Sequence, residues 1–411
     1  MKVLILSAST GGGHMRASSA LKAYIEKNSE DSTVQIVDTL EYISPFLNRT
    51  VTDGYVYLAT KTPKMYGSLY KNTNNREKTI SALATGLIGS FSKKLIPLLR
   101  ETTPDVIITT HPFPTEMASI LKENDIIDTP LICIMTDYAP HLTWIHPGVD
   151  GYIVSNEGMV EPMVEMGAPR ERIHPFGIPV HEAFLIKQDK TDLLQKFGLH
   201  PELSTILIMA GSFGVTDILK IYNTIVKIPL DFQMVVITGK NQRLYDAFDR
   251  LLSKPVPLPK KPKPVKDSAK PQPVVKVKKE KPRKPTKLIY FTGEVEKYMQ
   301  AADFIITKPG GLTVSEALAS GLPMAIFNAI PGQEEENADF LINNNMAVRL
   351  EKGVSCAETI QSLLQDKERL DNMKSSCEAF GKGNSSENVF GLIHELLEEK
   401  EEKRKKRSGE E

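Results

Sequence analysis

Two glycine-rich turns, one near each end of the chain, combine residue types that bind anions and move protons. The first turn is residues 9–14 (STGGGH), which follow the apolar run at 3–6; the second is residues 308–313 (KPGGLT), which follow the apolar run at 304–306. In each case, an apolar run followed by a glycine-rich turn predicts a buried strand, a tight turn and the start of a helix. The unpaired N–H groups at such a helix start can bind an anion. Together they indicate group transfer from a phosphate-activated donor.

His14 is the candidate catalytic base of the first turn. It follows Gly12 and Gly13 and opens the predicted helix. The positive end of a helix disfavours the imidazolium form, so the ring stays neutral. A neutral histidine at a cleft wall takes a proton from an acceptor hydroxyl. The alternative interpretation is a histidine that only caps the helix.

The second turn offers a phosphate cradle, formed by the backbone at Gly311 and the hydroxyl of Thr313. Glu316 lies three residues further on and has two interpretations. It completes a capping box with Thr313, or its carboxylate accepts hydrogen bonds from the two hydroxyls of a ribose. Residues 211–214 (GSFG), which include Ser212 and Phe213, follow another apolar run. They form a second phosphate contact or a plain strand–helix turn.

Polar side chains also follow two other apolar runs. Residues 331–337 (PGQEEEN) start a predicted helix, where acids are favourable on dipole grounds alone. Gln333, Glu336 and Asn337 instead suit a sugar, because amides and carboxylates supply donors and acceptors together. Asp137 follows the run at 131–135, at a strand end where ligands of open sheets bind. We expect it to orient His14, to contact the acceptor, or to cap a turn.

The order of apolar runs and helical spacings predicts an α/β fold. The predicted strands are residues 3–6, 34–37, 106–108, 131–135 and 151–154, then 205–209, 234–237, 288–291, 304–306 and 324–327. Such alternation is typical of doubly wound, mostly parallel sheets with helices on both faces. The pattern breaks at residues 177–180 (GIPV), a predicted linker. Residues 358–402 predict helices only, and the last one crosses back onto the first domain.

Length and charge narrow the class of protein. A chain of 411 residues is longer than a domain with a single hydrophobic core usually is, so two domains are expected. Net charge is zero, but residues 254–287 hold thirteen lysines and arginines, two acids and nine prolines. This insert is predicted to be disordered, and the acidic remainder argues against a nucleic-acid binder. The three cysteines have no metal-binding spacing. Without a signal peptide or an apolar span, we expect a cytoplasmic protein.

Two segments are candidates for contact with a membrane. Residues 41–100 are rich in aromatics and poor in strand signals. Within them, residues 80–91 are apolar and precede Lys93 and Lys94, so they predict either an interfacial segment or an ordinary core helix. The basic insert at 254–287 is an electrostatic tether to anionic lipid or a surface loop without function.

The joint order of these motifs resembles that of the diacylglycerol glycosyltransferases. The resemblance rests on GGGH at 11–14, TD at 136–137, GIPV at 177–180, GSFG at 211–214, KPGGLT at 308–313 and PGQE at 331–334. That family includes plant monogalactosyldiacylglycerol synthases and bacterial processive diacylglycerol glucosyltransferases. The lipid II N-acetylglucosaminyltransferase of peptidoglycan synthesis is a more distant relative. The resemblance covers about residues 1–395, except for the basic insert.

The resemblance implies a GT-B fold, a UDP-sugar donor, inversion at the anomeric carbon and no catalytic metal or other cofactor. By motif match, His14 is the base and Glu316 the ribose contact. The other residues implied to bind the donor come from the same motifs: the turn residues Gly12 and Gly13; Gly311, Thr313, Ser212 and neighbouring Phe213 at the diphosphate; and Gln333, Glu336 and Asn337 at the sugar. Asp137 is expected to be a catalytic residue together with His14.

The expected organisation is an acceptor-binding domain at 1–178, with 41–100 as its lipid region, a UDP-sugar domain at 179–380, and a helix with a basic tail at 381–411. The expected reaction transfers a hexose from UDP to diacylglycerol at the cytoplasmic face of an anionic membrane. The lack of a transit peptide favours glucose over galactose. Alternatives are another lipid acceptor, a UDP-N-acetylglucosamine 2-epimerase, which the apolar segment 41–100 argues against, or a non-catalytic lipid- or nucleotide-binding module.

Overall fold

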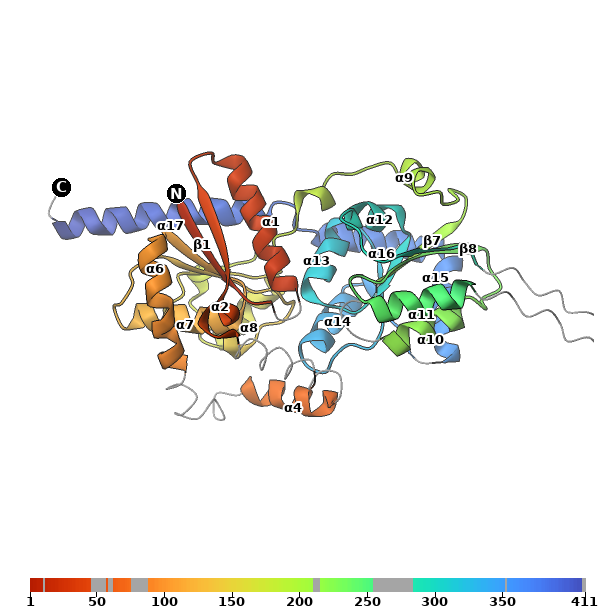
Figure 1. Ribbon diagram of the computed structural model, residues 1–411, viewed down its shortest axis with the longest axis horizontal. Helices are drawn as coiled ribbons and strands as arrows, with labels where there is room; N and C mark the ends of the chain where they lie inside the picture. The colour runs from red at the N-terminus through yellow and green to blue at the C-terminus, as the bar shows by residue number, and fades with distance from the viewer. Residues whose placement is uncertain are drawn as a thin grey trace, which may run out of the picture.

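Two six-stranded parallel sheets form the framework of the molecule (Figure 1). The computed structural model describes residues 1–9, 12–45, 57, 62–74, 88–209, 215–253, 284–351 and 353–408. One sheet belongs to the N-terminal half and the other to the C-terminal half, and helices cover both. This architecture confirms the predicted doubly wound α/β class.

The first sheet has the strand order β2-β1-β3-β4-β5-β6. Its strands are β1 (Lys2–Ser7), β2 (Thr33–Asp38), β3 (Val106–Thr109), β4 (Leu131–Ile134), β5 (Gly151–Ile153) and β6 (Ile173–His174). All neighbours pair in parallel. The direction of winding reverses between β1 and β3, which makes that pair the topological switch point of this half.

The second sheet has the order β12-β11-β10-β7-β8-β9. Its strands are β7 (Ser204–Met209), β8 (Phe232–Ile237), β9 (Thr286–Ile289), β10 (Phe304–Thr307), β11 (Met324–Ile326) and β12 (Ala347–Arg349). This is the order of a dinucleotide-binding Rossmann sheet, and its switch point lies between β7 and β10.

The ten predicted strands are confirmed, with one shift. The strand expected at 288–291 is Thr286–Ile289, and the side chains of Tyr290 and Phe291 beyond it are exposed. Strands β6 and β12 were not predicted, because two or three residues at a sheet edge are too few to show a pattern.

Most of the helices pack on the faces of the two sheets. In the N-terminal half they are α1 (Gly13–Asn28), α2 (Thr39–Ile43), α4 (Pro63–Thr73), α6 (Ile96–Thr102), α7 (Pro112–Glu123) and α8 (Val160–Glu165). In the C-terminal half they are α9 (Lys190–Lys196), α10 (Val215–Ile225), α11 (Gln242–Ser253), α12 (Val295–Ala301), α13 (Gly311–Ala319), α14 (Gln333–Asn343), α15 (Val354–Gln365) and α16 (Lys367–Phe380). The last helix is α17 (Ser385–Ser408).

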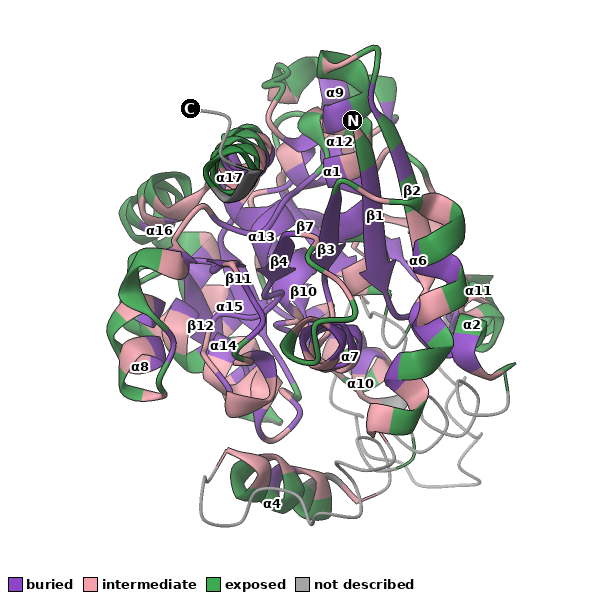
Figure 2. Ribbon diagram, turned by 90° about the vertical axis from the view of Figure 1, so that its left-hand side faces the viewer, coloured by how far each residue is buried: buried purple, intermediate pink, exposed green. Residues whose placement is uncertain are grey.

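Helix α17 returns to the N-terminal half, as predicted. Figure 1 shows it extending from the C-terminal half across the first sheet. Val389, Leu392 and Ile393 pack in the same apolar cluster as Val3 and Ile5 of β1. Burial of these side chains fastens the end of the chain to its beginning. Figure 2 shows β1 almost entirely in the colour of buried residues. Its neighbour β3 is buried too, whereas β2 at the sheet edge is only partly buried.

Candidate active site

The side chains and glycine turns that could bind or act on a ligand lie at the carboxyl ends of strands, beside the two switch points. His14 follows β1 and His111 follows β3, while Gly310 follows β10. Ligands of open parallel sheets bind at such positions. Ser212 and Phe213, predicted on the turn after β7, lie outside the described residues. The candidate site is therefore the boundary between the two sheets.

Helices α1 and α13 lie side by side across this boundary (Figure 1). A Cβ on Gly13 would lie 3.6 Å from Cβ of Leu312, the second residue of α13. One turn later, Arg16 pairs with Glu316. The two helices thus begin at the same level, and Gly12 turns the chain into α1 with φ of 77°. Their unpaired first N–H groups and positive ends suit one shared anion.

The imidazole of His14 has a defined tautomer. Its Nδ1 lies 2.6 Å from the carbonyl oxygen of Thr110 and 2.9 Å from Oγ1 of Thr136. A carbonyl oxygen only accepts hydrogen bonds, so Nδ1 carries the proton of the neutral ring. The lone pair is therefore on Nε2, which is where a general base needs it.

Burial keeps His14 neutral. Removal from water lowers the pKa of His14 to about 4, and the hydrogen bond to Thr110 opposes the shift only in part. The ring of His111 lies 4.8 Å away and nearly perpendicular, and the ring of Trp144 lies 6.4 Å away. His111 was not among the predicted site residues. Its signal is its place directly after β3, at the same switch point as His14.

Asp137 does not orient His14, so one of its expected roles is wrong. Its carboxylate accepts hydrogen bonds from Nε2 of Gln333 at 2.5 Å and from Nδ2 of Asn337 at 3.5 Å. The imidazole donates instead to a backbone carbonyl and needs no carboxylate. Burial raises the pKa of Asp137 to about 6, and the two amide donors limit the rise. Asp137 thus links the N-terminal half to the start of α14.

Asn337 is fully buried between the halves. Its Oδ1 accepts a hydrogen bond from the backbone N–H of Tyr138 at 2.8 Å, and its Nδ2 donates to the carbonyl of Pro309 at 3.0 Å. The Tyr138 hydroxyl meets Oγ of Ser315 at 2.8 Å. Asn337 therefore holds the halves together, and its contact with a donor sugar stays a prediction.

Helix α13 excludes the capping-box interpretation of Thr313 and Glu316. It begins at Gly311, with Gly310 as the N-cap residue, so Glu316 lies in the second turn. The Glu316 side chain is 5% exposed, and its two carboxylate oxygens lie 3.1 and 3.3 Å from Nη1 of Arg16. Glu316 thus faces α1, while Thr313 lies half-buried in the first turn.

The titration of Glu316 provides a test by pH. Burial raises the pKa of Glu316 to about 7, although Arg16 opposes the rise. A raised carboxyl pKa contributes stability that is complete below the unfolded value and is lost as pH rises through 7. We therefore expect Glu316→Gln to raise the free energy of unfolding at pH 8 by about 2 kcal/mol. Urea denaturation at pH 8 and at pH 4.5 measures this gain. A gain of the same size at both pH values would contradict it.

The three residues predicted to bind the sugar share the start of α14. Gln333 contacts Asp137, Asn337 contacts Tyr138, and Oε2 of Glu336 accepts a hydrogen bond from the hydroxyl of Tyr70 at 2.8 Å. All three therefore meet the N-terminal half.

Gly311 marks the tightest approach of the two halves. A Cβ at this position would lie 1.8 Å from the carbonyl oxygen of Thr136. Real Cβ atoms do not come that close to backbone, so the closed arrangement requires glycine here. The predicted phosphate-binding backbone of Gly311 is in this way set directly against the loop that follows β4.

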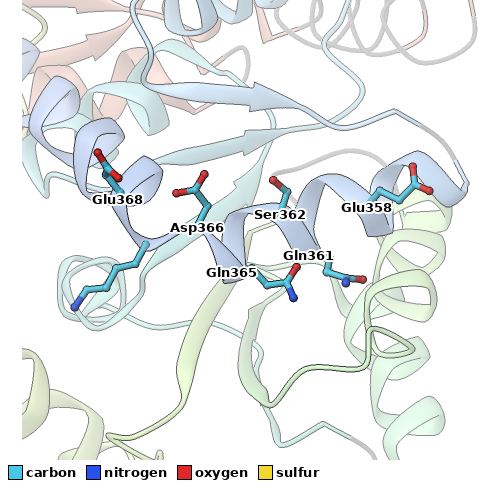
Figure 3. Close-up of a pocket in the computed structure, with 7 residues that line it drawn as sticks. Glu358, Gln361, Ser362, Gln365, Asp366 and Glu368 are labelled. Carbon is cyan, nitrogen blue, oxygen red and sulfur yellow. The ribbon is translucent and has the colours of Figure 1, made fainter.

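A groove on the outer surface contains none of the predicted residues. Figure 3 shows it along α15 and the start of α16, with side chains that include Glu358, Ser362 and Asp366. All the residues that line it are polar or charged, and it lies outside the boundary between the sheets.

Cysteines and metal-binding groups add no further centre in the described ranges. Cys133, Cys356 and Cys377 are buried and free, and burial raises the pKa of Cys133 to about 12. No cluster of three or more His, Cys, Asp or Glu side chains suited to a metal occurs among the described residues. The expectation of metal-free catalysis stays a prediction.

Among the described residues, no helix has the length and apolar character needed to span a bilayer.

Comparison with known families gives two matches along the chain. Residues 14–180 match the monogalactosyldiacylglycerol (MGDG) synthase family, and residues 264–389 match the glycosyltransferase family 28 C-terminal domain. The first match begins at His14, and the second includes α13 and α14. The chain thus combines an MGDG synthase domain with a glycosyltransferase family 28 C-terminal domain.

Curated relatives match almost the whole chain. A processive diacylglycerol beta-glucosyltransferase of Bacillus pumilus is 28% identical over 399 residues, which are 96% of this chain and 94% of the relative. A protein of the same name from Bacillus cytotoxicus is 29% identical over 403 residues, covering 97% and 94%.

Solved structures identify the fold as GT-B. MurG of Acinetobacter baumannii superposes with a TM-score of 0.58 at 14% identity, over 96% of this chain and 99% of MurG. The MnaA–UDP structure of S. aureus gives 0.59 at 12% identity, over 97% of both chains. The matched domain and the curated relatives identify this chain as an enzyme, a glycosyltransferase that uses a UDP-sugar.

Proposed function

We propose that this glycosyltransferase moves glucose from UDP-glucose to diacylglycerol with inversion at the anomeric carbon. The curated relatives named diacylglycerol beta-glucosyltransferases support the acceptor and the sugar. The observation that carries the mechanism is the tautomer of His14. Its Nδ1 donates to the carbonyl of Thr110, which leaves Nε2 free to accept a proton beside the start of α13.

The reaction that follows from this geometry is a single displacement. The acceptor hydroxyl oxygen forms a bond to the anomeric carbon while the bond from that carbon to the diphosphate breaks. Nε2 of His14 takes the hydroxyl proton, and UDP leaves with the electron pair. The starts of α1 and α13 stabilise the negative charge that grows on the diphosphate. Inversion requires that the base and the leaving group act on opposite faces of the sugar.

Glu316 and Arg16 connect donor binding to this arrangement. In the proposed complex, the buried carboxylate of Glu316 accepts hydrogen bonds from the ribose hydroxyls. Arg16, whose side chain is 50% exposed, then turns from Glu316 toward solvent or the diphosphate. The ion pair thus keeps the Glu316 carboxylate in position while no nucleotide is bound.

We further propose that the enzyme works at the inner face of the membrane and touches it with α4. Met65 and Leu69 are 58% and 51% exposed and lie one turn apart on this helix, flanked by exposed Lys64 and Lys71. Apolar side chains with adjacent lysines favour the interface of anionic lipids. Residues 80–87 of the segment first expected there lie outside the described residues. Phe91 at its end packs partly into the core.

Removing this apolar pair is expected to weaken membrane binding. The double variant Met65→Ser/Leu69→Ser loses most of the free energy of inserting two side chains, so binding to anionic vesicles should fall about tenfold or more. Vesicle co-sedimentation at fixed lipid concentration measures the loss. Ile186→Ser is the matched control, because Ile186 is 58% exposed on a different surface. Equal losses in the two proteins would contradict the proposed face.

A lipid product assay tests the reaction. The full chain is incubated with diacylglycerol in anionic vesicles and with UDP-glucose or UDP-galactose, and the lipids are analysed by mass spectrometry. We expect hexosyl-diacylglycerol with UDP-glucose. Binding of UDP without any lipid product from either donor would overturn the proposed acceptor and favour another lipid or the epimerase alternative.

A further inference from the structure

Helix α4 bridges the two halves beside the start of α14. In Figure 1, α4 lies below the boundary, beneath α14. Figure 2 shows it apart from the first sheet. It belongs by sequence to the N-terminal half, yet it packs on the loop that precedes α14. The start of α14 carries the three candidate sugar contacts.

Two glycines make this contact possible. A Cβ on Gly67 of α4 would lie 2.7 Å from Cβ of Pro331, a ring atom that cannot move without its backbone. Across the same contact, a Cβ on Gly332 would lie 2.8 Å from the ring of Tyr70. Gly332 also has φ of 98°, which other residues rarely adopt. Each partner thus offers a bare backbone to the other, and α4 fits onto the loop at van der Waals distance.

Tyr70 is anchored within its own half. Its ring lies 4.3 Å from that of His141, and its carbonyl lies 3.0 Å from Nε2 of His141. Nδ1 of His141 accepts a hydrogen bond from the backbone N–H of Thr143, so Nε2 carries the proton and donates to Tyr70. Further along, Oδ1 of Asn74 accepts a hydrogen bond from the N–H of Leu142. These contacts fix Tyr70 relative to the loop that follows Asp137.

The hydroxyl of Tyr70 reaches into the C-terminal half. It donates to Oε2 of Glu336 at 2.8 Å. Burial and the nearby Glu336 carboxylate raise the pKa of Tyr70, so the phenol stays a donor throughout the physiological range. An ionised carboxylate has two acceptor oxygens. The phenol uses one of them, and Oε1 remains for another donor.

We propose that Tyr70 is a positioning residue for the donor sugar, because its hydroxyl holds Glu336 so that Oε1 accepts a hydrogen bond from a hydroxyl of the hexose. This inference rests on the proposed function, in which Glu336 contacts the sugar. It adds that a residue of the lipid-facing helix sets the geometry of the donor site. Hexose recognition then depends on the docking of α4, whereas recognition of the uridine and diphosphate does not.

The experiment compares two ligands that differ only by the hexose. Dissociation constants of UDP-glucose and of UDP are measured by calorimetry on the full chain and on Tyr70→Phe. Loss of a hydrogen bond to a charged group is expected to weaken UDP-glucose binding about tenfold, with UDP binding unchanged. Glu336→Gln should produce the same selective loss. The double variant should be no weaker than either single variant, because both act on one contact.

A second pair of variants separates docking of α4 from its folding. Gly67→Ala favours the helix itself but places a Cβ against Pro331. We expect it to weaken UDP-glucose binding selectively, as Tyr70→Phe does. Ser68→Ala favours the same helix on its exposed side and should leave both affinities unchanged.

Several outcomes would overturn the inference. They are unchanged UDP-glucose binding in Tyr70→Phe, an equal loss for both ligands, or additive losses in the double variant. Failure of the proposed function is a separate result, because it shows as no hexosyl-lipid from the unaltered chain, whereas the binding comparison needs no acceptor.

Discussion

Replacement of His14 by alanine is expected to lower kcat for hexosyl transfer by about 10²–10⁴-fold, the usual contribution of a general base. The variant lacks Nε2, which receives the acceptor proton in the proposed reaction. The starts of α1 and α13 and the carboxylate of Glu316 remain in place. UDP binding should therefore change less than about threefold. Kinetics on diacylglycerol vesicles and calorimetry with UDP measure the two quantities.

A second substitution separates the base from its scaffold. Glutamine at position 14 has an amide that can still donate to the carbonyl of Thr110, but it cannot accept a proton. We expect His14→Gln to be as inactive as His14→Ala while remaining as stable as the unaltered chain. Activity within tenfold of the unaltered chain in either variant would show that His14 is not the base.

Alanine at position 311 is expected to prevent the halves from closing. Its Cβ would lie 1.8 Å from the carbonyl oxygen and 2.9 Å from the carbonyl carbon of Thr136, and neither backbone atom can yield locally. The halves must move apart by an ångström or more, and a displacement of that size costs about 10²-fold in rate. We expect kcat for hexosyl transfer to fall by about that factor. Small-angle scattering should show a more extended molecule.

The neighbouring glycine provides the control for this prediction. Gly310 has φ of −69°, and a Cβ there would have no atom within 4 Å. Gly310→Ala should therefore leave the scattering profile unchanged and reduce activity much less than Gly311→Ala. Similar profiles and rates in the two variants would contradict the closure argument, because both remove a glycine from the same turn.

Much of the fold is predictable because its signals are local. Ten strands appear as short apolar runs, since both faces of a parallel sheet are buried. The start of α1 is predictable from a glycine turn that follows a strand. The two missed strands, β6 and β12, lie at sheet edges and are too short to form a pattern. The match to known families agrees with the motifs, whereas the roles of the individual site residues stay predictions.

The errors concern side chains that act over long distances in the chain. One of the roles expected for Asp137 was to orient His14, but Thr110 and Thr136 hold that ring, and Asp137 contacts α14. The capping box at Thr313 has the right spacing, yet the helix begins three residues earlier than that interpretation needs. Spacing defines candidate neighbours within one helix, but it does not define where the helix starts.

The sequence alone determined which residue types stand at the strand ends: His14 after one glycine turn, Glu316 after another, and a polar set at the start of α14. Only the tertiary structure decided which atoms meet. The Thr110 carbonyl selects the tautomer of His14, Arg16 holds Glu316, and Tyr70 holds Glu336. These partners are separated by 96, 300 and 266 residues. Local periodicity specifies strands and helices, whereas such contacts arise only when the packing of two sheets brings their ends together.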